Sequence, residues 1–250
     1  MQHQLSGPPR HWSYAVLALL IALLAVVTFG PWQMASNPLM RASTWLYTQI
    51  DLATSGWSSG AGTLVDLVTE GLLVLLAGLL ALTVWLARGN VRAVAVGLSG
   101  GAGVVGAIAA TLFVKAMFAE PRPCEAVPDL HALSECPPMG DWSFPSNHSG
   151  ISAALAAAVV LTALAAGTRR TWLPVVAVAS AVVTAALRVV SGVHYPHDVV
   201  AGLLFGSSVA VAVTIAATPV AVAVLTRLGM GGLVEADDVV TAPVPLVRQP

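Results

Sequence analysis

Charged residues are scarce in this sequence: Asp, Glu, Lys and Arg make up 9% of the 250 residues, against about 25% in an ordinary soluble domain. Hydrophobic residues make up 57%, and the mean hydropathy is +0.83. This composition excludes a soluble globular protein and indicates an integral membrane protein. The net charge of -1, without any basic tract, gives no sign of nucleic-acid binding.

Cysteine is also scarce, since the sequence has only Cys124 and Cys136, both in one polar loop. Their Cys-x11-Cys spacing lacks convincing His or Cys partners, which argues against a zinc site, and no metal or other cofactor is expected. In an oxidising compartment the two residues would form a disulfide that closes the loop, and the alternative is two free thiols.

Long uncharged runs are abundant, and each can cross about 30 Å of hydrocarbon as a helix. We therefore predict an all-α fold, a polytopic bundle of six transmembrane helices within residues 13–226. Residues 1–12 form a polar lead and residues 227–250 a mobile tail. The predicted spans are Ser13–Gly30, Thr63–Ala87, Ala93–Phe118, His148–Ala166, Trp172–Val190 and Val199–Leu225.

Residues 40–53 carry apolar side chains at roughly helical spacing beside Trp45 and Tyr47. This pattern predicts a short interfacial helix between spans one and two. Residues 55–62 are expected to form a flexible loop, and residues 119–146 a long polar one. The first apolar run is too long for a signal-peptide core and no clear cleavage site follows it, so it is interpreted as a retained span.

Six spans place both termini on one side of the membrane. With cytoplasmic termini, seven of the eleven Lys and Arg residues lie inside and four lie outside, the bias that the positive-inside rule requires. The four outside are Arg41, Lys115, Arg122 and Arg188. The protein is thus expected in the plasma membrane, with its polar loops outside.

Three polar segments occur at span ends that this topology places on the outer side. They contain Lys115 and Arg122, then Ser146, Asn147 and His148, then Arg188, His194 and Asp198. Cations and the free N–H groups of a helix N-terminus are the groups that neutralise phosphoryl oxygens. Their composition therefore indicates a phosphate site.

The spacing of the histidines suggests how such a site would react. His194 and Asp198 are four residues apart, so the carboxylate can accept from one ring nitrogen and leave the other free to attack phosphorus. His148, at the start of a span, can protonate the leaving oxygen. A purely structural His194–Asp198 pair is the alternative, and His197 is interpreted as a bystander, because its spacing offers no second carboxylate.

At these residues the chain resembles the type-2 phosphatidic acid phosphatase superfamily, the lipid phosphate phosphatases that share a site with vanadium haloperoxidases. The family pattern is Lys-x6-Arg-Pro, Pro-Ser-Gly-His and Ser-Arg-x5-His-x3-Asp. Lys115, Arg122 and Pro123 match the first element. The others match except at Asn147, where Gly is usual, and Leu187, where Ser is usual.

The resemblance implies a metal-independent phosphatase domain that works through a phosphohistidine. His194 would be the nucleophile, Asp198 its orienting partner and His148 the acid. The phosphoryl group would be bound by Lys115, Arg122, Arg188, Ser146 and nearby backbone amides, including that of Asn147. Leu187 removes a hydroxyl that nothing in the sequence replaces.

Asp66 and Glu70 lie four apart on one face in the outer half of the second span. Acidic residues at such depth usually face the bundle or a wet cavity. Two roles stay open for them. They would either partner Lys115 or an arginine as a second layer around the site, or belong to a polar network without a part in catalysis.

These features together predict an enzyme that removes a terminal phosphate from a lipid at the outer leaflet, with a polyprenyl diphosphate as the leading substrate in a bacterial membrane. Phosphatidylglycerol phosphate, phosphatidic acid and a polyprenyl-phosphoryl sugar phosphate are alternative substrates. A lipid phosphotransferase and a lipid phosphate transporter are alternative functions. The expected partners are the lipid substrate and the bilayer, and nothing in the spans identifies an oligomeric state.

Overall fold

The computed structural model describes residues 10–31, 36–127, 130 and 132–230. This part of the chain forms helices and contains no strand. The helices are α1 (Arg10–Phe29), α2 (Pro38–Thr54), α3 (Ser59–Leu86), α4 (Val91–Phe118), α5 (Pro123–Ala126), α6 (Asn147–Ala165), α7 (Trp172–Val190) and α8 (Pro196–Arg227). Six of them are long and apolar enough to cross a membrane, which confirms the predicted all-α, six-span architecture. Most of the predicted lead and tail lies outside the described residues.

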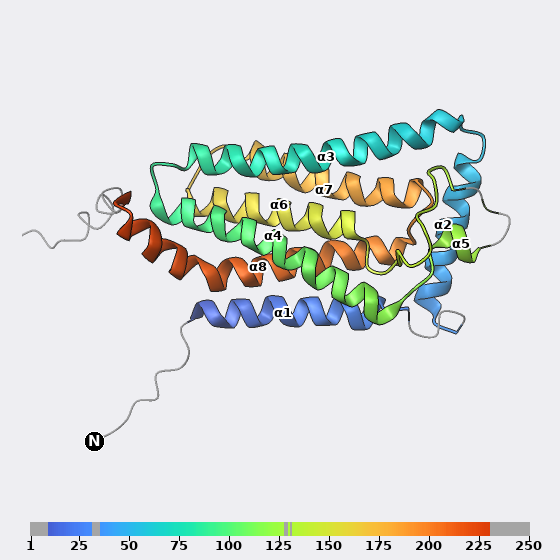
Figure 1. Cartoon of the computed structure of the whole chain (residues 1–250), viewed down its shortest axis with the longest axis horizontal. Coiled ribbons are helices and arrows are strands. Elements are labelled where there is room, and N and C mark those ends of the chain that lie inside the picture. Colours follow the sequence, from blue (N-terminus) through green and yellow to red (C-terminus); the bar gives the residue numbers. More distant parts are fainter. Residues whose placement is uncertain (1–9, 32–35, 128–129, 131, 231–250) are drawn as a thin grey trace, which may run out of the picture.

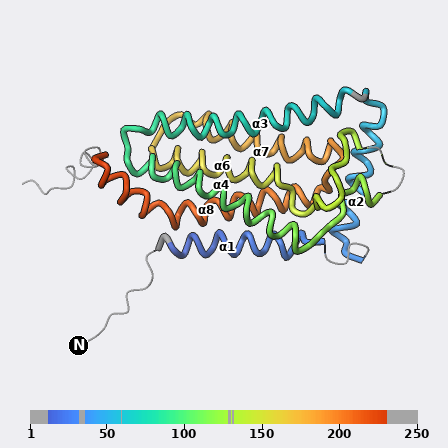
Figure 2. Tube along the Cα trace, in the orientation of Figure 1, coloured from blue at the N-terminus to red at the C-terminus, as the bar shows by residue number. Residues whose placement is uncertain are grey.

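The six long helices run side by side, and α2 crosses one end of the bundle next to α5 (Figures 1 and 2). Helix α6 lies at the centre and packs against α3, α4, α7 and α8. Helix α1 packs on the outside of α8. The helix predicted for residues 40–53 is thus present as α2, three residues longer than expected, and its place at the membrane interface stays a prediction.

Helix α1 shows how the sequence selects a lipid-facing position. Its buried residues are Ala15, Ala18, Ala22 and Ala25, which recur at helical spacing and form one narrow face. The long apolar side chains on the other faces are exposed, Leu24 among them at 62%. Small residues let the helix approach α8 closely, as is usual where lipid supplies no hydrophobic drive between helices.

Glycine residues bring α8 against the first turn of α6. A Cβ atom on Gly206 would lie 2.3 Å from the carbonyl oxygen of Gly150, and one on Gly202 would lie 2.6 Å from that of Ser146. Real Cβ atoms do not come so close to backbone. These two positions therefore fix the separation between the segment that carries His148 and the segment that carries Asp198.

Two predicted helix starts were wrong, and one short helix was missed. Helix α3 begins at Ser59, so the predicted loop 55–62 is shorter than its glycines indicated. Gly62 allows the backbone near Leu133 to approach α3, because a Cβ atom would lie 1.9 Å from the carbonyl oxygen of Leu133. Helix α8 begins at Pro196, which suits a first helical position. The short helix α5 was not predicted within the 119–146 loop.

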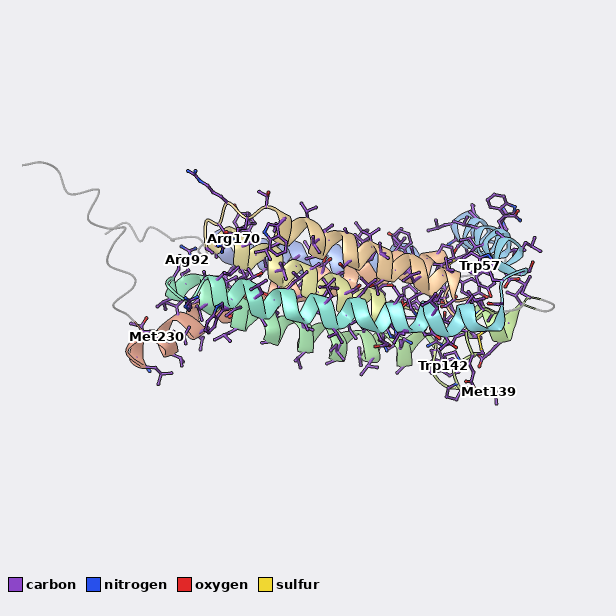
Figure 3. The ribbon with its side chains drawn as sticks, turned by 90° about the horizontal axis from the view of Figure 1, so that it is seen from above. Trp57, Arg92, Met139, Trp142, Arg170 and Met230 are labelled. Atoms are coloured by element: carbon purple, nitrogen blue, oxygen red, sulfur yellow. A yellow bond between two sulfur atoms is a disulfide. The ribbon has the colours of Figure 1, made fainter. Side chains whose placement is uncertain are left out.

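The two ends of the bundle differ in their surface side chains. Arg92 and Arg170 lie at the end where α8 finishes, whereas Trp57 and Trp142 lie at the end with α2 (Figure 3). The three predicted site segments all belong to the α2 end, because they follow α4, precede α6 and connect α7 to α8.

Candidate active site

The turn between α7 and α8 carries His194, whose side chain is 1% exposed. Gly192 in this turn has a φ of +82°, which is in the left-handed region that favours glycine. A Cβ atom there would also lie 2.7 Å from the Cα atom of Ala132, so the loop between α5 and α6 packs directly on the turn. On the other side, the Tyr47 hydroxyl of α2 donates to the carbonyl of Gly192 at 3.0 Å. The turn is therefore held from two sides.

Hydrogen bonds around His194 define which ring nitrogen carries the proton. The Ser143 hydroxyl donates to Asp198 Oδ2 at 2.5 Å, and its oxygen can still accept. His194 Nδ1 lies 3.3 Å from that oxygen and 3.4 Å from Asp198 Oδ2, so Nδ1 holds the proton. Arg122 Nη1 lies 3.1 Å from His194 Nε2, and a guanidinium can only donate. The lone pair of Nε2 therefore points toward the guanidinium.

The protonation state of His194 suits a nucleophile. Burial lowers the pKa of His194 to about 3, and the positive charges of Arg122 and Lys115 act in the same direction, against the opposing effect of Asp198. The ring is therefore neutral at physiological pH. A neutral imidazole with Nδ1–H held by a carboxylate and Nε2 unprotonated is the form that attacks an electrophile.

Asp141 bridges the two cations nearest to His194. Its Oδ1 lies 3.1 Å from Lys115 Nζ and its Oδ2 lies 3.0 Å from Arg122 Nη2. Lys115 also donates to the carbonyl of Trp142, and Arg122 Nε donates to that of Asp141 at 2.6 Å. Although burial raises the pKa of Asp141, Lys115 and Arg122 outweigh that effect and hold it below its usual value. The two cations therefore bind an anionic group in the way that they would bind a phosphoryl group.

Arg188, the third predicted cation, and His148, the predicted proton donor, pair with the acidic residues of α3. Arg188 Nη1 lies 3.0 Å from Asp66 Oδ1, and His148 Nε2 lies 2.8 Å from Glu70 Oε1. Both carboxylates are largely exposed, at 44% for Asp66 and 63% for Glu70, whereas Arg188 is buried. Of the two roles left open for these acids, the contacts favour that of partners of site residues. Asp66 meets an arginine, as that role predicted, whereas Glu70 meets a histidine.

Ser146 and Asn147 form the N-terminus of α6. Ser146 is the N-cap residue but its side chain makes no capping bond, and its oxygen accepts from Ser149 instead. Ser146 is wholly buried, so its side chain does not face solvent. Asn147 Oδ1 is buried without a hydrogen-bond partner among the described residues. What this segment offers to a phosphoryl group is chiefly the N–H groups of the first helical turn.

Electrostatic interactions join the two halves of the site. The charge of Arg122 acts on both His148 and Arg188, and that of Lys115 acts on His194. The structure thus brings all eight predicted catalytic and phosphate-binding residues to one end of the bundle. Such a cluster can neutralise a phosphoryl group, attack it with an imidazole and protonate its leaving group.

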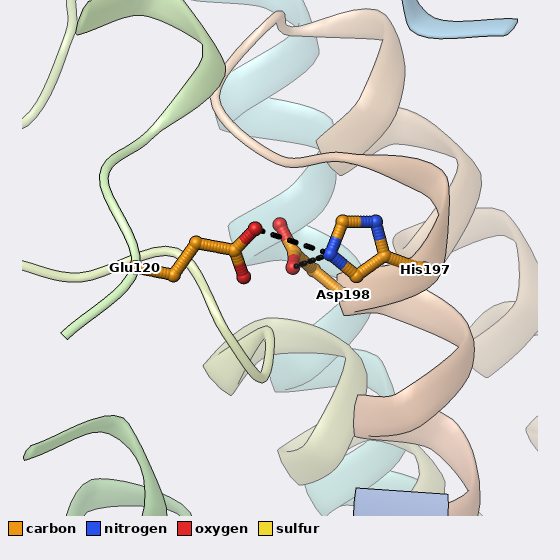
Figure 4. Close-up of side chains that lie close together, drawn as sticks. All are labelled: Glu120, His197 and Asp198. Atoms are coloured by element: carbon orange, nitrogen blue, oxygen red, sulfur yellow. Dashed lines mark hydrogen bonds and ion pairs between the residues drawn. The ribbon is translucent and has the colours of Figure 1, made fainter. Parts of the chain in front are cut away.

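The premise for interpreting His197 as a bystander, that it has no second carboxylate as a neighbour, was wrong. Its ring is 1% exposed, with Nε2 lying 3.2 Å from Glu120 Oε1 and 3.3 Å from Asp198 Oδ1 (Figure 4). The second carboxylate that the local spacing lacks comes from Glu120, 77 residues away. Donor atoms of these three residues lie within 4.8 Å of one another. We assign these distances to polar contacts between protein groups, because 3.2 and 3.3 Å are close to hydrogen-bond lengths.

Sequence reasoning also missed Ser143 and Asp141. Ser143 contacts both members of the His194–Asp198 pair, and Asp141 contacts both cations. Both lie in the five residues before Ser146, so their closeness to a recognised element was the available signal. The same outer loop contains a disulfide between Cys124 and Cys136, with an S–S distance of 2.03 Å.

Fold and site together define a six-span membrane protein with a histidine-centred, cation-lined site at one end. The PAP2 superfamily matches residues 93–220, just over half of the chain, and the protein belongs to that family. No curated protein matches it. A crystal structure described as the first transmembrane PAP2 type phosphatidylglycerolphosphate phosphatase, from Bacillus subtilis, shares the fold with a TM-score of 0.55 and 20% identity. The alignment covers 78% of this chain and 92% of that one.

Proposed function

We propose that the protein is a membrane lipid phosphatase that hydrolyses a terminal phosphate at the extracytoplasmic face through a phosphohistidine at His194. The observation that carries this proposal is the set of contacts on the His194 ring. Ser143 and Asp198 hold the proton on Nδ1, and Nε2 faces a guanidinium with its lone pair. Family membership supports the same chemistry.

The reaction follows from these positions in two steps. The lone pair of His194 Nε2 attacks phosphorus while the bond from phosphorus to the leaving oxygen breaks, and His148 gives that oxygen a proton. Water then attacks the phosphohistidine, His148 takes a proton from it, and the N–P bond breaks to release inorganic phosphate. Lys115, Arg122 and Arg188 stabilise the charge on the phosphoryl oxygens in both steps. No step requires a metal ion.

Two observations support an outer location for the site. Described arginines at the far end of the bundle, Arg88, Arg92, Arg169, Arg170 and Arg227, outnumber the cations at the site end that lack a part in the site. That asymmetry favours a cytoplasmic far end. The Cys124–Cys136 disulfide belongs to the site end, and disulfides persist in oxidising compartments.

The leading substrate is a polyprenyl diphosphate, whose dephosphorylation would return a carrier lipid for cell-wall synthesis. Phosphatidylglycerol phosphate is the second candidate, because the structural relative is described as a phosphatase of that lipid. Phosphatidic acid and a polyprenyl-phosphoryl sugar phosphate complete the panel. In every case the acyl or prenyl chains would reach the site between the spans, from within the bilayer.

The proposal is tested by measuring phosphate release from this panel by purified wild type and His194→Ala, with and without EDTA. We expect activity that EDTA does not reduce and that His194→Ala abolishes. Arg122→Ala should also abolish it, whereas Arg170→Ala, the matched arginine at the opposite end, should not. Quenching a single turnover in alkali should trap phosphate on the wild type, because phosphohistidine is labile only in acid. Full activity in His194→Ala would refute the mechanism.

The alternatives give different results in the same preparation. A phosphotransferase would form a new phosphate ester when an alcohol acceptor is added, and a transporter would move the lipid between leaflets without releasing phosphate. Sidedness is tested separately by labelling with an impermeant thiol reagent. Trp57→Cys should react in intact cells, and Gly89→Cys, in the connection between α3 and α4, should react only after lysis.

A further inference from the structure

Behind the nucleophile lies a second layer of buried groups for which the proposed reaction has no use. Asp198 turns Oδ2 toward His194. Its other oxygen, Oδ1, faces His197 (Figure 4). His197 in turn contacts Glu120, and all three of these inner side chains are at most 1% exposed. Buried carboxylates are costly unless they are paired or protonated, so their presence here needs an explanation.

Ser43 on α2 defines the orientation of the His197 ring. Its oxygen accepts the backbone N–H of His197 at 3.1 Å and lies 2.8 Å from Nδ1 of the same residue. The carboxyl oxygens that face Nε2 accept a proton from it, and in a neutral ring Nδ1 is then the nitrogen that accepts from the Ser43 hydroxyl. The ring proton then lies on Nε2, the nitrogen that faces Glu120 and Asp198.

Two oxygens of this cluster have no hydrogen-bond partner among the described residues. They are Glu120 Oε2 and Asp198 Oδ1, and both atoms are buried. A single N–H of His197 cannot satisfy two carboxylates that carry four oxygens between them. One additional proton, held by Glu120 and donated to Asp198, would satisfy both orphan oxygens and remove one of two adjacent buried negative charges.

We propose that His197 and Glu120 are positioning residues for the nucleophile. Glu120 is the neutral acid that donates to Asp198 Oδ1, and His197 is a neutral imidazole whose Nε2–H is directed at both carboxyl groups. Together they hold the Asp198 carboxylate so that Oδ2 meets Ser143, the Tyr195 N–H and His194. The inference rests on the proposed function, since it assigns the network a part in presenting His194.

Other titratable and charged groups around this network are few. Those that face it are Lys115 from α4, Arg122 from the following loop, Tyr47 from α2, and His194 and Tyr195 from the turn. Burial raises the pKa of Tyr47 to about 12 and raises that of Tyr195 as well, so neither phenol titrates in an ordinary assay. His194, whose pKa is about 3, therefore titrates at the acid end of the kcat profile, apart from both phenols.

Two variants of similar size separate the two sides of the His197 ring. His197→Gln replaces the Nε2–H that faces the carboxyl groups, whereas His197→Asn reaches only as far as Nδ1 and the Ser43 hydroxyl. We expect His197→Gln to keep kcat within about threefold of wild type. We expect His197→Asn to lose about 10- to 100-fold in kcat, the scale known for removing the outer partners that orient metal-binding histidines, with KM unchanged.

The pH profile distinguishes positioning from packing. When Asp198 loses the His197 donor, its negative charge is less neutralised and the pKa of His194 rises. The acid limb of kcat should therefore move to higher pH in His197→Asn, by about one unit, and return in His197→Gln. Glu120→Gln should stay within about threefold of wild type, because its amide replaces a neutral acid. Thr214→Val is the control, since Thr214 is buried on the same helix and bonds only its own helix backbone.

Each result decides the matter. Equal loss in His197→Asn and His197→Gln, or an unmoved acid limb in His197→Asn, would overturn the positioning role. A Glu120→Gln variant as slow as His197→Asn would overturn the assignment of Glu120 as a neutral acid. Loss of activity with EDTA and its recovery with zinc would show that a metal ion, and not a proton, joins Glu120 to Asp198. Phosphate release by wild type and its loss in His194→Ala test the proposed function alone. The two failures are therefore distinguishable.

Discussion

Asp141 occupies the two cations that the proposed reaction needs for the phosphoryl group. Its carboxylate oxygens lie 3.1 Å from Lys115 Nζ and 3.0 Å from Arg122 Nη2. A substrate must displace this carboxylate before it can bind both cations. Asp141→Asn should therefore strengthen the binding of phosphate, whereas the contact from Arg122 Nε to the residue 141 carbonyl is kept.

The size of the effect follows from the exposure of the pair. The Asp141 side chain is 47% exposed, so its two ion pairs are screened by solvent and are worth far less than buried ones. Exposed pairs contribute about 0.2–1 kcal/mol each, which gives about 1 kcal/mol for the two contacts together. That free energy corresponds to roughly a fivefold lower inhibition constant for phosphate.

The assay is competitive inhibition by inorganic phosphate of the hydrolysis of a short-chain lipid phosphate, in wild type and in Asp141→Asn. Inorganic phosphate serves because it needs the cations but no lipid contact. An unchanged or higher inhibition constant in Asp141→Asn would show that the carboxylate does not compete with phosphate, and would refute the reasoning. Arg170→Gln at the opposite end is a control for a general change in charge.

The same pair gives a pH dependence with a defined sign. Lys115 and Arg122 hold the pKa of Asp141 below its ordinary value of 3.8 despite partial burial. The ion pairs therefore stabilise the fold fully above about pH 4 and are lost as the pH falls through the lower, folded-state pKa. The advantage of Asp141→Asn in phosphate binding should shrink over that same range, because a protonated Asp141 no longer competes.

Three further changes test a helix contact, the disulfide and the Arg188 guanidinium. Gly206→Ala should push α8 from α6 and lower both kcat and the midpoint of thermal unfolding, at a cost of about 1–3 kcal/mol, while Gly101→Ala, where a Cβ atom meets nothing within 4 Å, should do neither. Reducing the Cys124–Cys136 bridge, which closes a loop of 12 residues, should cost about 3 kcal/mol and lower the unfolding midpoint measured by fluorescence. Arg188→Lys keeps the charge but loses the planar fork, so kcat/KM should fall about tenfold, and an unchanged value would show that charge alone suffices.

The spans could be predicted from the sequence because a long uncharged run has few other solutions. Each of the six predicted spans corresponds to a long helix, and the errors fall at helix ends such as Ser59. Gly62 near this end lies inside the helix and allows a close contact, and does not mark a loop. The eight residues of the predicted site could be proposed because they belong to three short, spaced elements. Their gathering at one end follows from topology alone, since successive spans reverse direction.

The partners of those residues could not be predicted in the same way. Glu120 meets His197 across 77 residues, and Ser43 meets it across 154. No local spacing records such contacts, because they depend on how α2 and the outer loop fold over the end of the bundle. Asp141 was a further case, since an acidic residue in a polar loop has no pattern that relates it to Lys115, 26 residues earlier.

Helix α2 crosses the bundle end and exposes Trp45 and Leu52, while Tyr47 bonds the turn at Gly192 and Ser43 bonds His197. An amphipathic helix of this kind settles at a fixed depth among lipid headgroups. On the predicted interfacial placement of α2, the depth of His194 would be tied to the membrane surface and not to the length of the spans. In bilayers of different thickness the spans can tilt, yet His194 should stay level with the phosphate groups of the surrounding lipids.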